Sequence, residues 1–301
     1  MLVSCIVLAY NSAKTVIETL ESIKNQTYKE IELIVSDDAS TDDTVKICQE
    51  WIERNKERFV RTELITVNKN TGIAENCNRS ISAAKGEWVK TIAADDILLP
   101  TCIEDFVDFA DKNPDAKWMS SYLRVYNETF EEQNCCSTRR VLAANFFSLS
   151  AEGQLRELAF EDCITGPSVF FNHEMLSHVG PFDNQYIIED WPYFLKILEN
   201  GFKCYLLTKE TVGYRIHKSL SNNADGSIFN YDFEKKVRPF QKDRCWIHLT
   251  AKEIITKKIW FLIQDLFQLL NLNKNDGFWN RVYYRICNTL RSLCGRITRS
   301  N

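Results

Sequence analysis

Short apolar segments alternate with amphipathic segments through the first hundred residues. The apolar, β-branched segments predict strands, and the segments between them carry apolar residues at helical spacing. The predicted strands lie at 3–8, 32–35, 64–67 and 88–92, and the predicted helices at 14–24, 44–58 and 73–84. Because strands and helices that alternate in this way form βαβ units, the pattern predicts an α/β fold with a Rossmann-like, mostly parallel sheet flanked by helices.

The pattern is less regular after Pro100. It predicts a helix at 101–112, a strand at 117–125, a polar loop at 127–137, a helix at 191–200 and a strand at 204–207. From about residue 229 the chain becomes helical, with apolar residues mostly on one face at 254–272 and again at 278–297. We therefore expect two halves of one α/β domain at 1–100 and 101–225, followed by a C-terminal helical extension at 226–301.

Polar residues follow each of the first four predicted strands. They are Tyr10-Asn11, Asp37-Asp38, residues 68–70 and Asp95-Asp96. In an open parallel sheet the carboxyl ends of the strands line the ligand crevice, so we expect these four clusters to converge. Asn, Asp and Ser also favour helix caps and turns, and this alternative suits residues 40–43. It explains Asp95-Asp96 poorly, because an apolar segment follows them directly.

The composition bounds the possible classes of protein. Of the 301 residues 45% are hydrophobic and 26% are charged, which excludes a disordered or fibrous protein. The net charge of −4 argues against a nucleic-acid-binding protein, which would need a basic surface. The eleven cysteines show no C-x-x-C spacing, and the first residues lack the basic region of a secretory signal. We therefore expect reduced, mostly buried thiols, no zinc site and a cytoplasmic location.

The charge is distributed unevenly along the chain. Residues 252–301 carry nine Lys/Arg against three Asp/Glu, whereas the rest of the chain is net negative by ten. The basic amphipathic segment 278–297 is of the kind that lies on an anionic membrane surface. We therefore consider an anionic membrane surface, here the inner face of the cell membrane, as a partner of residues 252–301. Such a helix also packs on its own domain or in a homodimer, and periodicity alone does not separate these alternatives. No segment is apolar over the length that spans a bilayer.

Six short motifs follow one another in a fixed order. They lie at 4–11, 34–44, 70–88, 94–96, 180–191 and 214–221. In this order they resemble the family 2 glycosyltransferases with the GT-A fold, of the type used in bacterial capsule and O-antigen assembly. The second motif contains Asp37-Asp38-Ala39-Ser40-Thr41-Asp42, and the fourth is Ala94-Asp95-Asp96.

The resemblance implies inverting transfer of a sugar from a nucleotide diphosphate donor to a hydroxyl of a glycan or lipid-linked oligosaccharide. UDP is the commonest carrier in the family, and GDP and dTDP stay open. Residues 1–100 would then bind the nucleotide sugar, and residues 101–225 the acceptor. The implied donor contacts are Ala9, Tyr10, Asn11, Asp38, Asn70, Asp95 and Arg215.

These residue types suit a nucleotide sugar. Tyr10 offers an aromatic face for the base, Asp38 can accept a hydrogen bond from a pyrimidine N–H, and Asp95 can accept one from a ribose hydroxyl. Arg215 and His217 alternate along an extended segment, so both can point at a diphosphate. His217 alternatively completes the shell of a metal ion.

A divalent cation, Mg²⁺ or Mn²⁺, is the implied cofactor. Asp96 is the implied ligand, and the cation neutralises charge on the leaving diphosphate. Many relatives carry a further acidic residue two places before the last Asp, where this chain has Ala93-Ala94. Metal ligation therefore rests on Asp96, the diphosphate and His217, and loss of the metal requirement stays open.

Asp190 is the implied general base, which takes the proton of the acceptor hydroxyl. Glu189 beside it either raises the pKa of Asp190 or orients the acceptor. The alternative is a Glu-Asp pair that only caps the following helix.

Two rival functions make different predictions. A sugar nucleotidyltransferase needs a Gly-rich phosphate loop after the first strand, and this chain has Ala9-Tyr10-Asn11 there. A catalytically degenerate nucleotide-sugar-binding scaffold at the membrane would bind the donor without turnover and would not depend on Asp190.

Overall fold

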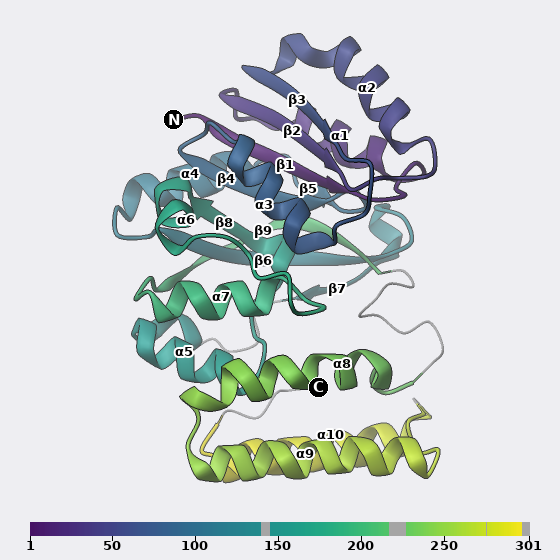
Figure 1. Ribbon diagram of the computed structural model, residues 1–301, viewed down its shortest axis with the longest axis vertical. Helices are drawn as coiled ribbons and strands as arrows, with labels where there is room; N and C mark the ends of the chain where they lie inside the picture. Colours follow the sequence, from purple (N-terminus) through teal and green to yellow (C-terminus); the bar gives the residue numbers. More distant parts are fainter. Residues whose placement is uncertain (140–144, 217–226, 275, 297–301) are drawn as a thin grey trace. The chain divides into compact units, whose positions relative to one another are not determined.

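The computed structural model describes residues 1–139, 145–216, 227–274 and 276–296 (Figure 1). The chain forms two compact units, each drawn from two separate stretches of sequence. Unit 1 comprises residues 1–141 and 164–215, and unit 2 comprises residues 142–163 and 216–301. Residues 142–163 thus group with the C-terminal helices rather than with the sequence that precedes and follows them.

Unit 1 contains a mixed sheet, which over the described residues has nine strands in the order β3-β2-β1-β4-β8-β6-β9-β5, with β7 paired to β6. The first four strands run parallel, and the later pairs are antiparallel. The strands are β1 Val3–Ala9, β2 Ile31–Asp37, β3 Arg61–Thr66, β4 Trp88–Ala93, β5 Ile97–Leu98, β6 Trp118–Asn127, β7 Cys135–Arg139, β8 Val169–Asn172 and β9 Cys204–Ile216. The predicted α/β fold is confirmed.

Helices flank this sheet, most of them near the predicted positions. They are α1 Val16–Lys24, α2 Thr44–Asn55, α3 Ile73–Ala83, α4 Cys102–Lys112, α6 His173–Val179 and α7 Asp190–Glu199. α6 was not predicted. Two predictions were wrong. The segment predicted as a polar loop contains the start of β7, and β9 is far longer than 204–207. Both are polar stretches that pair with neighbouring strands, and such pairing leaves little local sequence pattern.

A buried polar cluster in the sheet centres on Glu32 of β2, which is fully buried. One carboxylate oxygen accepts hydrogen bonds from the Ser4 hydroxyl and from the backbone N–H groups of Lys85 and Gly86, and the other pairs with Arg61 at 2.8 Å. Gly86 must be glycine, because a Cβ there would lie 2.6 Å from the backbone nitrogen of Ser4. Glu32 therefore ties β1, β3 and the turn before β4 to β2.

We expect Glu32→Ala to lower the free energy of unfolding by about 3 kcal/mol, because it removes the shared acceptor of the Ser4 hydroxyl, two backbone N–H groups and Arg61. Burial raises the pKa of Glu32, but the hydrogen bonds outweigh it and hold the pKa below its usual value. The carboxylate thus stabilises the fold above about pH 4.5, and this contribution is lost as the pH falls. Urea denaturation at pH 7 and pH 4 measures both effects.

The matched control is Glu50→Ala, which removes an exposed ion pair with Arg54 on α2. It should change stability by less than about 0.5 kcal/mol at either pH. Equal losses in the two variants would contradict the structural role of Glu32.

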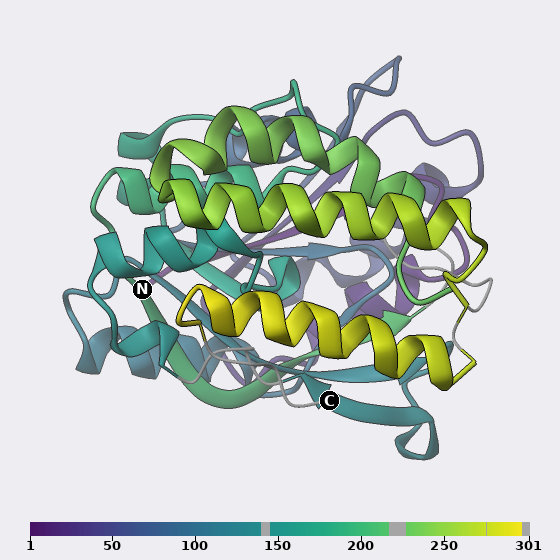
Figure 2. The same cartoon turned by 90° about the horizontal axis from the view of Figure 1, so that it is seen from below.

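Unit 2 is helical. Its helices are α5 Ala151–Phe160, α8 Tyr231–Phe240, α9 Ala251–Leu269 and α10 Phe278–Leu293. Both views show α9 and α10 side by side (Figures 1 and 2). The Trp260 indole N–H of α9 donates to the Tyr283 hydroxyl of α10 at 3.2 Å. The apolar face of α10, with Tyr283, Cys287 and Leu290, is buried. The predicted amphipathic helix therefore packs its apolar face within unit 2.

The cysteines follow the prediction. All eleven lie in the described ranges as thiols, and seven of them are buried. Over the same ranges, no helix is both long enough and apolar enough to cross a membrane.

Candidate active site

Three parallel strands deliver their following loops to one edge of the sheet in unit 1. The carbonyl of Ala9 at the end of β1 accepts the Asp38 N–H at 3.0 Å, and the carbonyl of Leu8 accepts the Ala94 N–H at 3.0 Å. The loops after β2 and β4 therefore begin on either side of the loop after β1. Asn70 follows β3, the next strand outward. The predicted convergence of the four polar clusters is confirmed by this topology.

The loop after β1 holds the second loop in place. Asn11 has a left-handed backbone conformation with φ of 51°. Its side-chain oxygen accepts the Thr41 N–H at 2.8 Å, and its own N–H donates to the Ser40 hydroxyl at 2.8 Å. Tyr10 beside it is 50% exposed, so its ring is accessible at the edge of the sheet.

The carboxylate of Asp38 is fully engaged by hydrogen bonds within unit 1. Its carboxylate accepts hydrogen bonds from the Thr71 N–H and hydroxyl, the Gly72 N–H and Arg79, at 2.6–3.0 Å. Burial raises the pKa of Asp38, but these donors lower it below its usual value. A carboxylate has about four acceptor positions, so all are used. Asp38 orders the loop that carries Asn70, and its contact with a base stays a prediction.

Thr71 and Arg79 were not found from the sequence, because their shared partner lies more than thirty residues away. The only local signal was Gly72, which has a φ of 88° and precedes α3 directly.

Asp96 is almost fully buried, with 2% of its surface exposed. Its Oδ1 accepts the backbone N–H of Arg215 at 2.8 Å. Burial, with the charge of Asp95 added, raises the pKa of Asp96 well above its usual value. A buried carboxylate with one hydrogen bond fits a cation, although no cluster of three His, Cys, Asp or Glu side chains exists among the described residues. His217, the second candidate ligand, lies outside those residues.

Arg215 is largely buried, and it binds the loop that carries Asp95 and Asp96, which we call the acidic loop. Its Nε donates to the Asp95 carbonyl at 2.8 Å, and its terminal nitrogens bind Glu18 and the carbonyl of Glu128. The guanidinium also stands over the Phe130 ring at 4.3 Å. Each of its three nitrogens thus has a partner within unit 1, and the predicted diphosphate contact stays a prediction. Glu18 was missed because it lies 197 residues from Arg215.

Glu189 and Asp190 stand at the start of α7. The preceding turn is held by Asn78 of α3, which donates to the Phe182 carbonyl at 3.0 Å and accepts the Phe182 N–H at 2.7 Å. Burial, with the charge of Asp190 added, raises the pKa of Glu189 to about 8, and burial also raises the pKa of Asp190. At neutral pH these two carboxyl groups therefore hold a proton more tightly than ordinary carboxylates do.

A glycine and a buried lysine shape the space beside Asp190. A Cβ on Gly166 would lie 3.0 Å from Oδ2 of Asp190, so glycine lets the carboxylate sit there. Lys90 of β4 is fully buried and donates to the carbonyl of Pro167, the next residue. Sequence reasoning missed Lys90, and a lysine within an apolar strand was the signal that could have found it.

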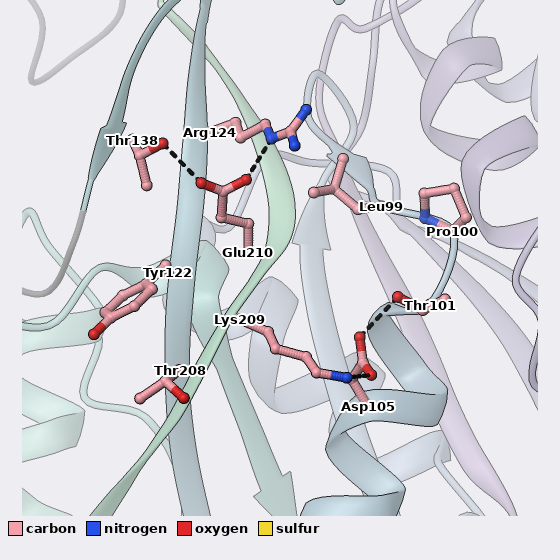
Figure 3. Close-up of a pocket in the computed structure, with 10 residues that line it drawn as sticks. All are labelled: Leu99, Pro100, Thr101, Asp105, Tyr122, Arg124, Thr138, Thr208, Lys209 and Glu210. Carbon is pink, nitrogen blue, oxygen red and sulfur yellow. Dashed lines mark hydrogen bonds and ion pairs between the residues drawn. The ribbon is translucent and has the colours of Figure 1, made fainter.

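A polar pocket of about 610 Å³ lies elsewhere in unit 1 (Figure 3). Its charged groups bind one another: Arg124 pairs with Glu210, and Lys209 pairs with Asp105. Glu210 is five residues along β9 from Arg215, or about 16 Å at strand spacing. None of the residues that line this pocket is among those described above for the strand-end site.

The raised pKa of Glu189 predicts that stability falls as the pH rises. Ionisation is disfavoured in the folded state, so the loss begins near the unfolded pKa of about 4.3 and is complete near the folded pKa. Glu189→Gln removes this pH-dependent loss of stability, because glutamine does not ionise. The free energy of unfolding of the variant should match that of the parent at pH 5 and exceed it at pH 8.5 by on the order of 2 kcal/mol. Thermal and urea unfolding across this range measure the difference. A stability difference between variant and parent that stays constant with pH would contradict the claim that burial raises the pKa of Glu189.

The chain was compared with known proteins. The model of the family described as "Glycosyl transferase family 2" matches residues 4–166. An uncharacterized glycosyltransferase of Haemophilus influenzae is 36% identical over 95% of this chain and 85% of its own length. WfaP of Escherichia coli, a UDP-Glc:alpha-D-GlcNAc-diphosphoundecaprenol beta-1,3-glucosyltransferase, is 28% identical over 79% of this chain and 83% of its own.

Solved structures agree on the fold. TarS of S. aureus, residues 1–349 in complex with UDP-GlcNAc, superposes with a TM-score of 0.59. The match covers 97% of this chain and 81% of that one at 18% identity. At this identity the likeness speaks for the fold alone.

Proposed function

The chain belongs to glycosyl transferase family 2 and is a glycosyltransferase, and we propose that it transfers a sugar from a UDP-sugar to a hydroxyl of a glycan or lipid-linked oligosaccharide by inversion. The observation that carries the proposal is the convergence of Tyr10, Asp38 and Asp95 on one sheet edge, in the unit that also holds Asp190. A donor site and a basic carboxylate are the two parts that this reaction needs.

The donor is proposed as a UDP-sugar. WfaP is named for UDP-Glc, and the TarS structure contains UDP-GlcNAc. In this chain the exposed ring of Tyr10 offers a face on which a base can stack, and the partly exposed Asp95 can accept from a ribose hydroxyl. Ala9, Asn11 and Asn70 line the same edge.

Family 2 enzymes generally depend on a divalent cation. We propose that Asp96 holds Mg²⁺ or Mn²⁺ together with the donor diphosphate, with His217 as a second candidate ligand. The cation would neutralise charge on the leaving diphosphate. The support within the chain is the buried carboxylate of Asp96, whose pKa is raised and which has no cationic side chain bonded to it among the described residues.

Asp190 is proposed as the general base for direct attack of the acceptor hydroxyl on the anomeric carbon. A carboxylate with a raised pKa accepts a proton more readily at neutral pH than an ordinary one. Glu189 adds negative charge beside it, which favours proton uptake by the pair.

The acceptor is proposed as a lipid-linked oligosaccharide in surface polysaccharide synthesis. WfaP, named for a diphosphoundecaprenol-linked acceptor, supports this class by its likeness over most of both chains. Such an acceptor would place the protein on the inner face of the cell membrane. The chain is a glycosyltransferase by its family, so the alternative of a scaffold without turnover is set aside.

Asp190→Asn should lower turnover about 10²–10⁴-fold while donor KM changes little, because a general base acts in the chemical step. The assay is release of the nucleotide diphosphate from a panel of nucleotide sugars, with and without acceptor. Asp183→Asn is the matched control, because Asp183 lies in the preceding turn and, among the residues the structure describes, its side chain binds only Gln185. Parent-like turnover in Asp190→Asn would show that Asp190 is not the general base, and no turnover of the parent with any nucleotide sugar would contradict the proposed donor class.

Asp96→Ala should raise the Mn²⁺ concentration needed for half-maximal turnover at least tenfold, because it removes the proposed protein ligand. Titration calorimetry of Mn²⁺ into protein saturated with UDP gives a readout that does not depend on turnover. Asp108→Ala, an exposed carboxylate on α4, is the control and should leave both values unchanged. Metal binding that survives Asp96→Ala unaltered would remove Asp96 from the ligand set.

A further inference from the structure

The exposed face of α9 carries a continuous row of large aliphatic side chains. They are Ile255, Ile259, Leu262, Leu266 and Leu269, each between 43% and 79% exposed, and we call them the α9 stripe. Their spacing of four, three, four and three residues keeps them on one side of the helix. Single exposed apolar residues are ordinary on soluble proteins, but a contiguous row marks a surface that binds something.

The other side of α9 is already used. Four of its residues are buried within unit 2: Trp260, Phe261, Gln264 and Phe267. The Phe267 ring contacts the rings of Trp279 and Tyr283, both of α10. The α9 stripe is therefore not a displaced part of the core of unit 2. It is a second apolar face on the same helix.

The charges beside the α9 stripe are positive on balance. Lys252 and Lys258 are exposed, and they flank the stripe on either side by helical geometry. Of the two acidic residues of α9, Glu253 is buried in the capping box with Thr250. The side chain of Asp265 is 44% exposed, but it pairs with Arg238 at 2.7 Å and accepts the Tyr231 hydroxyl at 3.0 Å. Because Arg238 balances the charge of Asp265, the lysines give the exposed face of α9 a net positive charge.

The neighbouring helix extends the same character. α10 runs beside α9, as Figure 2 shows, and its sequence contains no acidic residue. Arg281 and Arg285 are exposed on the side opposite its buried residues. Asp276, just before α10, caps its first turn by accepting the N–H groups of Phe278 and Trp279.

We propose that the α9 stripe, with Lys252, Lys258, Arg281 and Arg285, is a docking surface for an anionic phospholipid bilayer. α9 would lie flat in the interface, with its aliphatic side chains at the acyl boundary and the cations at the lipid phosphates. The contact is placed on α9, whereas the sequence pattern favoured the segment 278–297. The proposal rests on unit 2 alone and goes beyond the proposed function, which rests on unit 1.

The proposed membrane contact lies on α9 rather than on the segment 278–297 because of where the arginines of the C-terminal segment lie. Arg291 is buried and binds Glu161 through two hydrogen bonds of 2.6 and 2.8 Å. Arg296 pairs with Glu157 and Glu253. These two cations hold unit 2 together, so they are not available to lipid phosphates.

A second copy of the chain is the competing occupant, because spacing of three and four residues also suits a helix pair. Charge gives it little support. In a parallel pair Lys258 would face Lys258. In an antiparallel pair Lys258 would come near Asp265 of the other copy by heptad spacing, but Asp265 already pairs with Arg238 at 2.7 Å within its own unit 2. An anionic bilayer supplies negative charge along the full length of the surface.

The test is flotation of the full-length protein with vesicles of phosphatidylglycerol or phosphatidylcholine. We expect at least tenfold tighter binding to phosphatidylglycerol. The stripe variant Ile259→Ser/Leu262→Ser/Leu266→Ser should lose at least tenfold in affinity, and Lys252→Gln/Lys258→Gln should lose most of the preference for anionic lipid. Val60→Ser is the matched control, because Val60 is a 57% exposed aliphatic residue of unit 1, and it should bind like the parent.

Circular dichroism must show parent-like helix content in each variant. If the triple variant loses helix content, the single variant Leu262→Ser replaces it. The proposal is overturned if the parent does not float with phosphatidylglycerol, or if the folded stripe variant floats equally well. It is also overturned if light scattering shows a lipid-free dimer that the stripe variant converts to monomer. Donor hydrolysis in solution is measured on the same proteins, and it should be unchanged, so failure here is distinct from failure of the proposed function.

Discussion

Two carbonyl groups at the end of β1 fix the geometry on which the candidate active site depends. Those of Leu8 and Ala9 accept the N–H groups of Ala94 and Asp38, so the loops after β4 and β2 must begin beside the loop after β1. Parallel strands make this possible, because their carboxyl ends share one edge. The exposed ring of Tyr10 and the carboxylates of Asp38 and Asp95 then come from three loops without any of the loops having to be long.

The carboxylates of unit 1 divide according to how many donors each one meets. Glu32 and Asp38 are buried, and burial alone would raise their pKa values, yet each accepts four hydrogen bonds and its pKa is lowered. Asp96 lies deeper in the protein and accepts one backbone N–H, and its pKa is raised. Deeper burial and fewer donors therefore act together to separate Asp96 from the two carboxylates whose charge the fold satisfies.

The sequence predicts the parallel half of the fold well, because each strand and helix there has its own hydrophobic period. It also predicts which residues share the sheet edge, since strand ends follow from strand positions. It does not predict what those residues touch. Arg215 is shared among α1, the acidic loop and the chain after β6, and Asn78 binds a turn 104 residues away. Such partners are set by tertiary packing, and no local pattern contains them.

The C-terminal segment shows why a charge pattern alone misplaces a surface. Every arginine counts equally in a sequence, but burial beside Glu161, Glu157 and Glu253 removes Arg291 and Arg296 from the solvent-facing charge. The same packing leaves the aliphatic residues of α9 uncovered, although their pattern alone resembles that of a core helix. A helix with apolar residues on two sides can bury only one of them within a layer of neighbours. The charges of the folded unit, rather than those of the chain, therefore determine what the other side binds.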